Sequence, residues 1–117
     1  MFSRTVQEQI AQELAHAEAA RAAGNEGRAR VCARRAVGAA IRAALQARTG
    51  SLPASNAYEL LQQMQSWPNL PAEMHAAAAH LTRRVDTQFE LPAEMDLISD
   101  ARQLIQYLDS TSMEESK

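Results

Sequence analysis

Apolar residues recur at every third or fourth position along most of the chain, which is the spacing of amphipathic helices. Val6, Ile10 and Leu14 open this pattern, and Leu104 and Leu108 close it. Five such segments follow one another between cap residues, glycines and prolines, at residues 3–23, 25–48, 56–66, 71–88 and 92–108. Short connections between amphipathic helices favour antiparallel neighbours. The pattern therefore predicts an all-α fold, an up-and-down antiparallel helical bundle of about five helices.

The composition indicates one helical domain. The chain has 117 residues, of which 46% are hydrophobic but only 4% aromatic, so the core must be built from aliphatic side chains and alanine. Alanine favours the helix and leaves room for helices to approach one another. We expect residues 1–109 to form this domain and the polar residues 110–117 to form a disordered tail.

Charge is distributed unevenly between the second and the fifth predicted helix. Residues 25–50 contain six arginines and one acid, whereas residues 91–117 contain six acids and two basic residues. The formal net charge is −2, which argues against a generally basic protein that binds nucleic acid. We therefore expect the basic helix to lie beside the acidic one, with salt bridges between them neutralising most of the arginines.

Arg34 is unusual because it projects from the middle of the apolar face of its helix. The first interpretation places it inside the core, paired with an acid from another helix. Glu94 is the candidate for this partner, since it falls within the apolar stripe of the fifth predicted helix, at the first turn of that helix. An acid at such a position also satisfies the positive end of its own helix, which is the alternative role for Glu94.

Two further interpretations give Arg34 a binding role. It could lie at a homodimer interface, where arginine is enriched and small neighbours allow close approach; these neighbours are Ala33, Gly38 and Ala40. It could instead line a cleft for an anion such as a nucleotide phosphate, together with Arg30 or Arg35. The candidate ligand-binding residues are therefore Arg30, Arg34 and Arg35.

The remaining residues carry no pattern typical of a catalytic or metal site. Cys32 is the single cysteine, which excludes an intrachain disulfide, and His75 and His80 lie on different sides of their helix. No glycine-rich phosphate loop or nucleophile motif occurs. No apolar run is long enough to cross a membrane, and the polar N-terminal segment differs from a signal peptide. We expect a cytoplasmic protein that has no metal or cofactor.

The long second segment and its flanking elements resemble the HEPN family of small helical bundles. The likeness rests on the S-N-A-Y-E-L segment at residues 55–60 and on an alanine-rich helix that carries Ala33, Ala36, Val37, Ala40, Ile41, Ala44 and Leu45. It covers about Gln9–Leu108. HEPN domains occur beside minimal nucleotidyltransferases and in prokaryotic RNase toxins. The resemblance therefore implies a bundle fold and a nucleotidyltransferase-type partner protein.

The sequence departs from the RNase branch of that family. The signature of that branch is an arginine followed by a histidine after four to six residues, and none of His16, His75 or His80 has an arginine at that spacing upstream. RNA cleavage needs a base that titrates near neutral pH beside a cation that binds phosphate. We therefore expect a protein that is not an enzyme but a non-catalytic interaction or accessory module that self-associates as a homodimer. The alternative is a domain that binds nucleotide or RNA phosphate through the arginine cluster. The scarcity of aromatic residues disfavours RNA recognition by base stacking.

Overall fold

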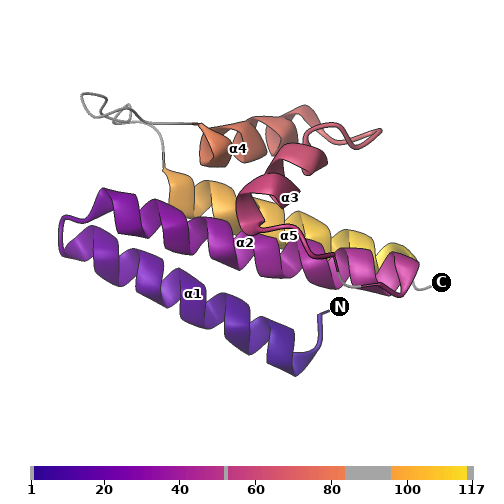
Figure 1. Ribbon diagram of the computed structural model, residues 1–117, viewed down its shortest axis with the longest axis horizontal. Coiled ribbons are helices and arrows are strands. Elements are labelled where there is room, and N and C mark those ends of the chain that lie inside the picture. Colours follow the sequence, from indigo (N-terminus) through magenta and orange to yellow (C-terminus); the bar gives the residue numbers. More distant parts are fainter. Residues whose placement is uncertain (1, 52, 84–95, 116–117) are drawn as a thin grey trace.

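Five α-helices make up the part of the chain that the structure describes. The structure is a computed structural model, and it describes residues 2–51, 53–83 and 96–115. The helices are α1 (Arg4–Ala22), α2 (Glu26–Thr49), α3 (Ala57–Met64), α4 (Ala72–Thr82) and α5 (Leu97–Glu115), and the described ranges contain no strand (Figure 1). The prediction of an all-α fold is confirmed.

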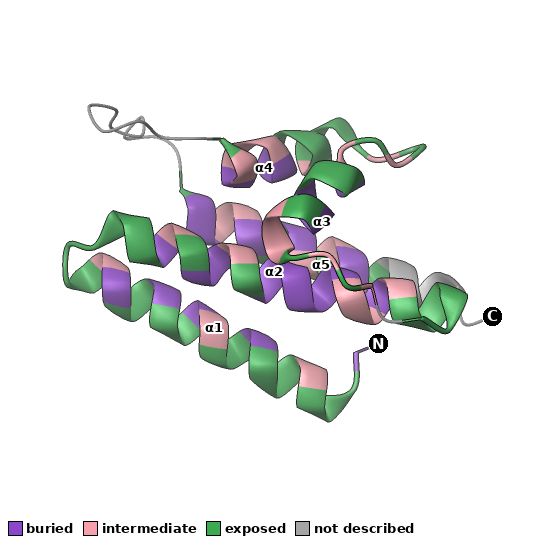
Figure 2. Cartoon of the chain, in the orientation of Figure 1, coloured by how far each residue is buried: buried purple, intermediate pink, exposed green. Residues whose placement is uncertain are grey.

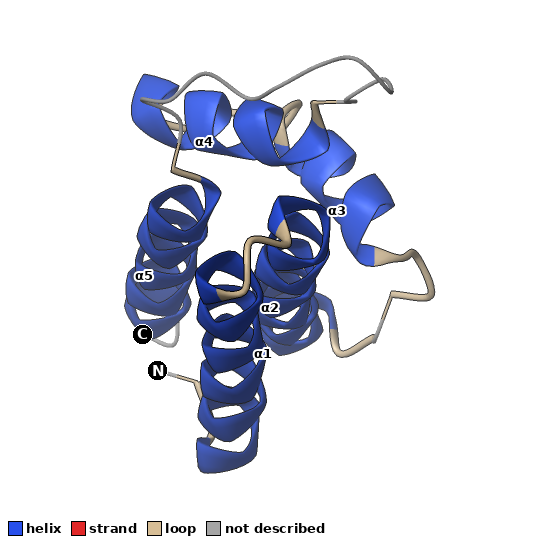
Figure 3. Cartoon of the chain, turned by 90° about the vertical axis from the view of Figure 1, so that its left-hand side faces the viewer, coloured by secondary structure: helices blue, strands red, loops and turns tan. Residues whose placement is uncertain are grey.

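The central element is α2, which packs against α1, α3 and α5. The short helices α3 and α4 lie across the layer formed by α1, α2 and α5 (Figure 1, Figure 3). Chain direction alternates from α1 to α2 and from α4 to α5, whereas α2 and α5 run the same way (Figure 1). This parallel pair arises because α4 carries the chain back along the bundle before α5 begins.

The core is aliphatic and rich in alanine, as the composition predicts. Buried residues form continuous stripes on the facing sides of the helices, and the outer side of α1 is exposed (Figure 2). The middle of α2 is fully buried through Ala33, Ala36, Val37, Ala40 and Ile41. Because alanine side chains are small, neighbouring helices approach α2 closely, and larger side chains fill the space around it: Leu60, Leu61, Met64, Leu81, Leu104 and Leu108.

The start of α3 lies unusually close to α2. A Cβ atom added to Gly38 would lie 2.8 Å from the Cβ of Ala57 and 3.1 Å from its Cα. Both of these atoms belong to the backbone of α3 or are fixed directly to it, so they cannot move aside without the helix. The glycine at position 38 therefore allows α3 to begin directly on the surface of α2.

Side-chain caps define the starts of the first three helices. The Ser3 hydroxyl accepts from the N–H of Val6, and the Asn25 side chain accepts from the N–H of Arg28. Asn56 and Glu59 form a reciprocal capping box. At the other end of α2, Gly50 adopts the left-handed conformation, with φ of 76°. These caps and this stop are the ones that the sequence predicts.

The last two helices differ in length from their predictions. We expected a helix through residue 88, but α4 ends at Thr82 because Arg83 adopts an extended conformation. We expected the fifth helix to start near Pro92, but α5 starts at Leu97, after Asp96, whose carboxylate accepts from the N–H groups of Ile98 and Ser99.

At its other end, α5 continues to Glu115, whereas the sequence predicts an end near Leu108 and a disordered tail beyond it. Residues 109–115 contain no glycine or proline that would stop the helix. Glu94, which was expected in the first turn of the fifth helix, lies outside the described residues; the first turn consists of residues 97–100.

Candidate functional site

Arg34 extends from α2 toward the end of α4. Its Nε donates a hydrogen bond of 2.5 Å to the carbonyl oxygen of Leu81, and its guanidinium carbon lies 5.2 Å from the centre of the Tyr58 ring. The side chain is half-buried, and burial together with the nearby positive charge of Arg30 lowers the pKa of Arg34 below its ordinary value. Among the described residues its partners are a backbone carbonyl and an aromatic ring, not the carboxylate that the first interpretation expected.

Arg30 reaches the same end of α4. Its Nη1 donates to the carbonyl oxygen of Arg83 at 3.5 Å, and its buried Nε has no hydrogen-bond partner within the described ranges. The last carbonyls of a helix carry partial negative charge and accept no hydrogen bond from within the helix. Arg30 and Arg34 therefore stabilise the end of α4, which explains how two cations lie side by side without an acid between them.

The expected salt bridges between α2 and α5 are absent from the described residues. The ion pairs there involve none of the five arginines in the first three-quarters of α2, which are Arg28, Arg30, Arg34, Arg35 and Arg42. The two helices do pack together, but through their apolar sides. The reason is geometric, because the arginines project from other sides of α2 than the side that α5 covers.

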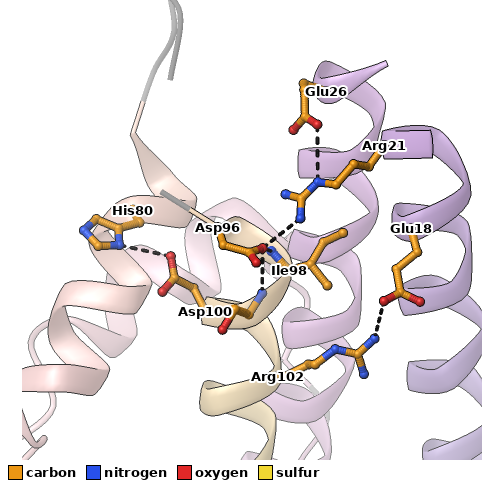
Figure 4. Close-up of polar contacts among 9 residues, drawn as sticks. Glu18, Arg21, Glu26, His80, Asp96, Ile98, Asp100 and Arg102 are labelled. Atoms are coloured by element: carbon orange, nitrogen blue, oxygen red, sulfur yellow. Dashed lines mark hydrogen bonds and ion pairs between the residues drawn. The ribbon is translucent and has the colours of Figure 1, made fainter. Parts of the chain in front are cut away.

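The acids at the start of α5 instead pair with residues of α1 and α4, as Figure 4 shows. Asp96 accepts from Arg21 at 2.8 Å, and this hydrogen bond, followed by the N–H of Ser99, lowers the pKa of Asp96. Asp100 lies 3.0 Å from Nδ1 of His80 on α4, and burial raises the pKa of Asp100 despite this contact. A further ion pair of 2.8 Å joins Arg102 on α5 to α1 (Figure 4). This network fixes the start of α5, and its ion pairs within the described residues do not include Arg28, Arg30, Arg34, Arg35 or Arg42.

A groove of about 640 Å³ lies between α1, α2 and the start of α3. Its lining consists of Gln9, Gln12 and Glu13 from α1, Val31, Arg34, Arg35 and Arg42 from α2, and Asn56, Ala57 and Tyr58 from α3. This volume is within the range of small-molecule sites. We call this feature the arginine groove.

The charges of the arginine groove are unbalanced. Three of the lining residues are arginines, and one, Glu13, is an acid, which lies 3.7 Å from the ring of His16. Arg42 donates to the carbonyl oxygen of Ser55 at 2.9 Å, just before α3 begins. The Arg35 side chain is exposed. A guanidinium group that donates to one carbonyl still has further N–H donors, so Arg34, Arg35 and Arg42 can bind an anion in the groove.

The sequence therefore identifies part of this site. Arg34 and Arg35 were candidate binding residues, and both line the groove; Arg30 does not, because it is directed to the end of α4. The residues predicted from the sequence do not include Arg42 or Tyr58, which also line the groove. The heptad spacing between Arg35 and Arg42 was the available signal for Arg42, whereas Tyr58 reaches the groove only because α3 folds onto α2.

The small residues next to Arg34 do not form an exposed dimer surface. Ala33 and Ala40 are fully buried within the chain, and Gly38 is covered by Ala57. The homodimer interpretation of Arg34 relied on these residues for close approach of a second copy. Their role is instead to bring the helices of one chain together.

Within the described ranges, no three His, Cys, Asp or Glu side chains gather as a metal site would require. No described helix combines the length and the apolar character that crossing a bilayer demands. Cys32 is buried in a small cluster with Ala17 and Ile98.

Comparison with known proteins adds no relative: the chain matches no protein-family model, no curated protein and no solved structure. The HEPN resemblance therefore stays a prediction that rests on the residues named above.

Proposed function

We propose that this protein is a non-catalytic helical binding module that holds an anionic partner in the arginine groove. The observation that carries this proposal is the set of three arginines, Arg34, Arg35 and Arg42, which line one groove and pair with no carboxylate among the described residues. Cations gathered in this way repel one another, and an anion in the groove removes that repulsion.

Side-chain chemistry supports an anion over a neutral ligand. Arginine presents several N–H donors in one plane, which suits the paired oxygens of carboxylates and phosphates. The groove also contains amide side chains from Gln9, Gln12 and Asn56, which can donate to further oxygen atoms of the same ligand. A single glutamate, Glu13, opposes this charge, and it lies on the α1 wall.

A catalytic role is not part of the proposal. His16 lies beside Glu13, which lines the groove, but His16 itself is absent from the lining. The two other histidines are on α4, where His80 contacts Asp100. General acid–base chemistry needs a titrating group within hydrogen-bond reach of the bound ligand. The groove residues supply binding groups, and none of the residues that line it is a histidine.

The partner protein implied by the HEPN resemblance, a nucleotidyltransferase-type protein, remains a proposal. So does self-association, for which a second groove of about 300 Å³ between α1 and α5 is the available surface. Its walls include the apolar residues Ile10, Leu14 and Ile105. Light scattering over a range of protein concentrations tests self-association directly, and a monomer throughout the micromolar range contradicts it.

Binding of anions tests the proposed function. ATP, a short single-stranded RNA and an acidic peptide are titrated against the full chain by fluorescence anisotropy at low and at physiological salt. We expect at least one to bind, more weakly at higher salt. Arg35→Gln should weaken binding about tenfold, because Arg35 is exposed and its loss removes one charged contact of about 1.4 kcal/mol.

Arg4→Gln is the matched control. Arg4 is also exposed, but it lies at the start of α1, pairs with Glu8 and does not line the groove. Its substitution removes the same charge from the protein and should leave binding unchanged. The proposal is wrong if none of the three anions binds, or if Arg4→Gln weakens binding as much as Arg35→Gln does.

A further inference from the structure

The arginine groove continues a regular stripe along α2. Arg28, Val31, Arg35, Gly38 and Arg42 follow one another at alternating steps of three and four residues, which places them along one side of the helix. This is the spacing by which one helix packs along another. Arg28 and Arg35 are exposed, and the groove is lined by Val31, Arg35 and Arg42.

Val31 is the exposed apolar residue of this stripe. It is 40% exposed, the highest value among the large hydrophobic residues that the structure describes. It lies between two arginines, one turn from each, and it lines the groove. A partner that covers Val31 must offer an apolar group between two anionic ones.

The start of α3 closes one end of the stripe. Gly38 is covered by Ala57, so the side of α2 that lies open runs from Arg28 to Arg35. Along α1, the wall of the groove consists of Gln9, Gln12 and Glu13, which also recur at helical spacing. The groove is thus a trough between two antiparallel helices with an end wall, a shape that accepts a third helix.

The distance between the arginines favours an acidic helix over a nucleotide. Arg28 and Arg35 are seven residues apart, which is a rise of about 10 Å along the helix axis. Carboxylates seven residues apart on a second helix have this same spacing, whereas the phosphates of a single nucleotide are bonded to one another. The ring of Tyr58 is already in contact with Arg34, which reduces the aromatic surface that a base would need for stacking.

We propose that the arginine groove docks an acidic amphipathic helix of a partner protein. Two carboxylates a heptad apart on that helix face Arg28 and Arg35, and an apolar residue between them covers Val31. This inference rests on the proposed function, because it names the class of anion that the same groove binds. Charge complementarity sets the register of the docked helix, since a shift of its acids out of phase moves them away from the arginines.

Two synthetic helical peptides of three heptads test this proposal. Both have the same composition. The in-phase peptide carries glutamates at every seventh position with leucine between them. In the out-of-phase peptide the same residues are rearranged so that the glutamates no longer lie seven residues apart. Fluorescence anisotropy with the full chain should show the in-phase peptide binding at least tenfold more tightly. Arg35→Gln and Val31→Gln should each reduce that preference several-fold, whereas Arg4→Gln should leave it unchanged.

Other outcomes separate this inference from the proposed function. Equal binding of the two peptides overturns the proposal of a docked helix. Tighter binding of ATP or a short RNA than of either peptide also overturns it. If Arg35→Gln abolishes that nucleotide binding, the groove still binds anions and the proposed function holds. A dimer of the chain that Arg35→Gln dissociates makes a second copy the occupant and also overturns the inference. If no peptide or nucleotide binds, both proposals fail. Val31→Gln and Arg35→Gln replace exposed side chains, so loss of folding is not expected, and circular dichroism verifies this.

Discussion

The contact between Gly38 and α3 leads to a prediction in which two glycines of one helix respond in opposite ways. Gly27 and Gly38 both lie within α2. A Cβ added at Gly27 meets nothing nearer than the Asn25 side chain, at 3.8 Å, whereas one at Gly38 meets the Cβ of Ala57 at 2.8 Å. Replacing glycine with alanine in a helix stabilises it by about 1 kcal/mol where there is room. Gly27→Ala should therefore stabilise the protein.

Gly38→Ala should destabilise the protein despite the same gain in helix propensity. The added methyl would overlap the Cα and Cβ of Ala57, so α3 must move away from α2. Overpacking of this kind typically costs about 1–3 kcal/mol. After the propensity gain is subtracted, we expect a net loss of about 1 kcal/mol, which lowers the melting temperature by about 4 °C. The two variants should then differ by about 2 kcal/mol in the free energy of unfolding.

Urea denaturation followed by circular dichroism measures this difference. A third variant identifies its cause: in the Gly38→Ala background, Ala57→Gly removes the overlapping methyl and should restore part of the lost stability. Two residues in direct contact are expected to show such a coupling energy. The reasoning is refuted if Gly38→Ala is as stable as Gly27→Ala, because the close approach of α3 would then impose no constraint.

Three further predictions concern the charged residues. Arg34→Ala should lower the free energy of unfolding by about 1–2 kcal/mol, because it removes the donor to the Leu81 carbonyl. Arg28 is exposed, so Arg28→Ala should change the free energy of unfolding little. Equal losses of the two variants in thermal melts would contradict this prediction. Asp96→Ala should cost about 1 kcal/mol at neutral pH, since a helix cap is lost. Arg21 lowers the pKa of Asp96 in the folded state. The stabilisation by Asp96 is therefore complete above its ordinary pKa of 3.8 and is lost as the pH falls through the lower folded-state pKa, so the stability difference between the native protein and Asp96→Ala should shrink as denaturation is repeated at decreasing pH below 3.8.

The helices that end at local signals could be predicted closely. Ser3, Asn25 and Asn56 carry their own acceptors for the first free N–H groups, and Gly50 adopts the left-handed conformation that ends α2. These interactions form between residues three or four apart in the sequence, so the predicted bounds of α1, α2 and α3 are correct to within two residues. The end of α4 has no comparable signal in the sequence, because its carbonyls accept hydrogen bonds from another helix. Arg30 and Arg34, both on α2, are the donors.

The candidate site could be predicted only in part. The heptad spacing of the arginines and the unusual position of Arg34 are visible in the sequence, and both features belong to the groove. Counting charges by segment led to the wrong partners, since it matched α2 with the acids of α5. Asp96 and Asp100 pair with Arg21 and His80 instead. A segment's net charge does not say in which direction its side chains project.

The sequence by itself determined that the chain forms amphipathic helices with an alanine-rich core, because periodicity and capping depend on neighbouring residues. Only the tertiary structure decided what the arginines of α2 do. Arg34 donates to a backbone carbonyl, and carbonyls are present at every residue, so no sequence pattern marks which one becomes the partner. The arginine groove likewise exists because Gly38 lets α3 begin against α2, which brings Tyr58 and Asn56 to the side of the helix where Arg35 and Arg42 lie.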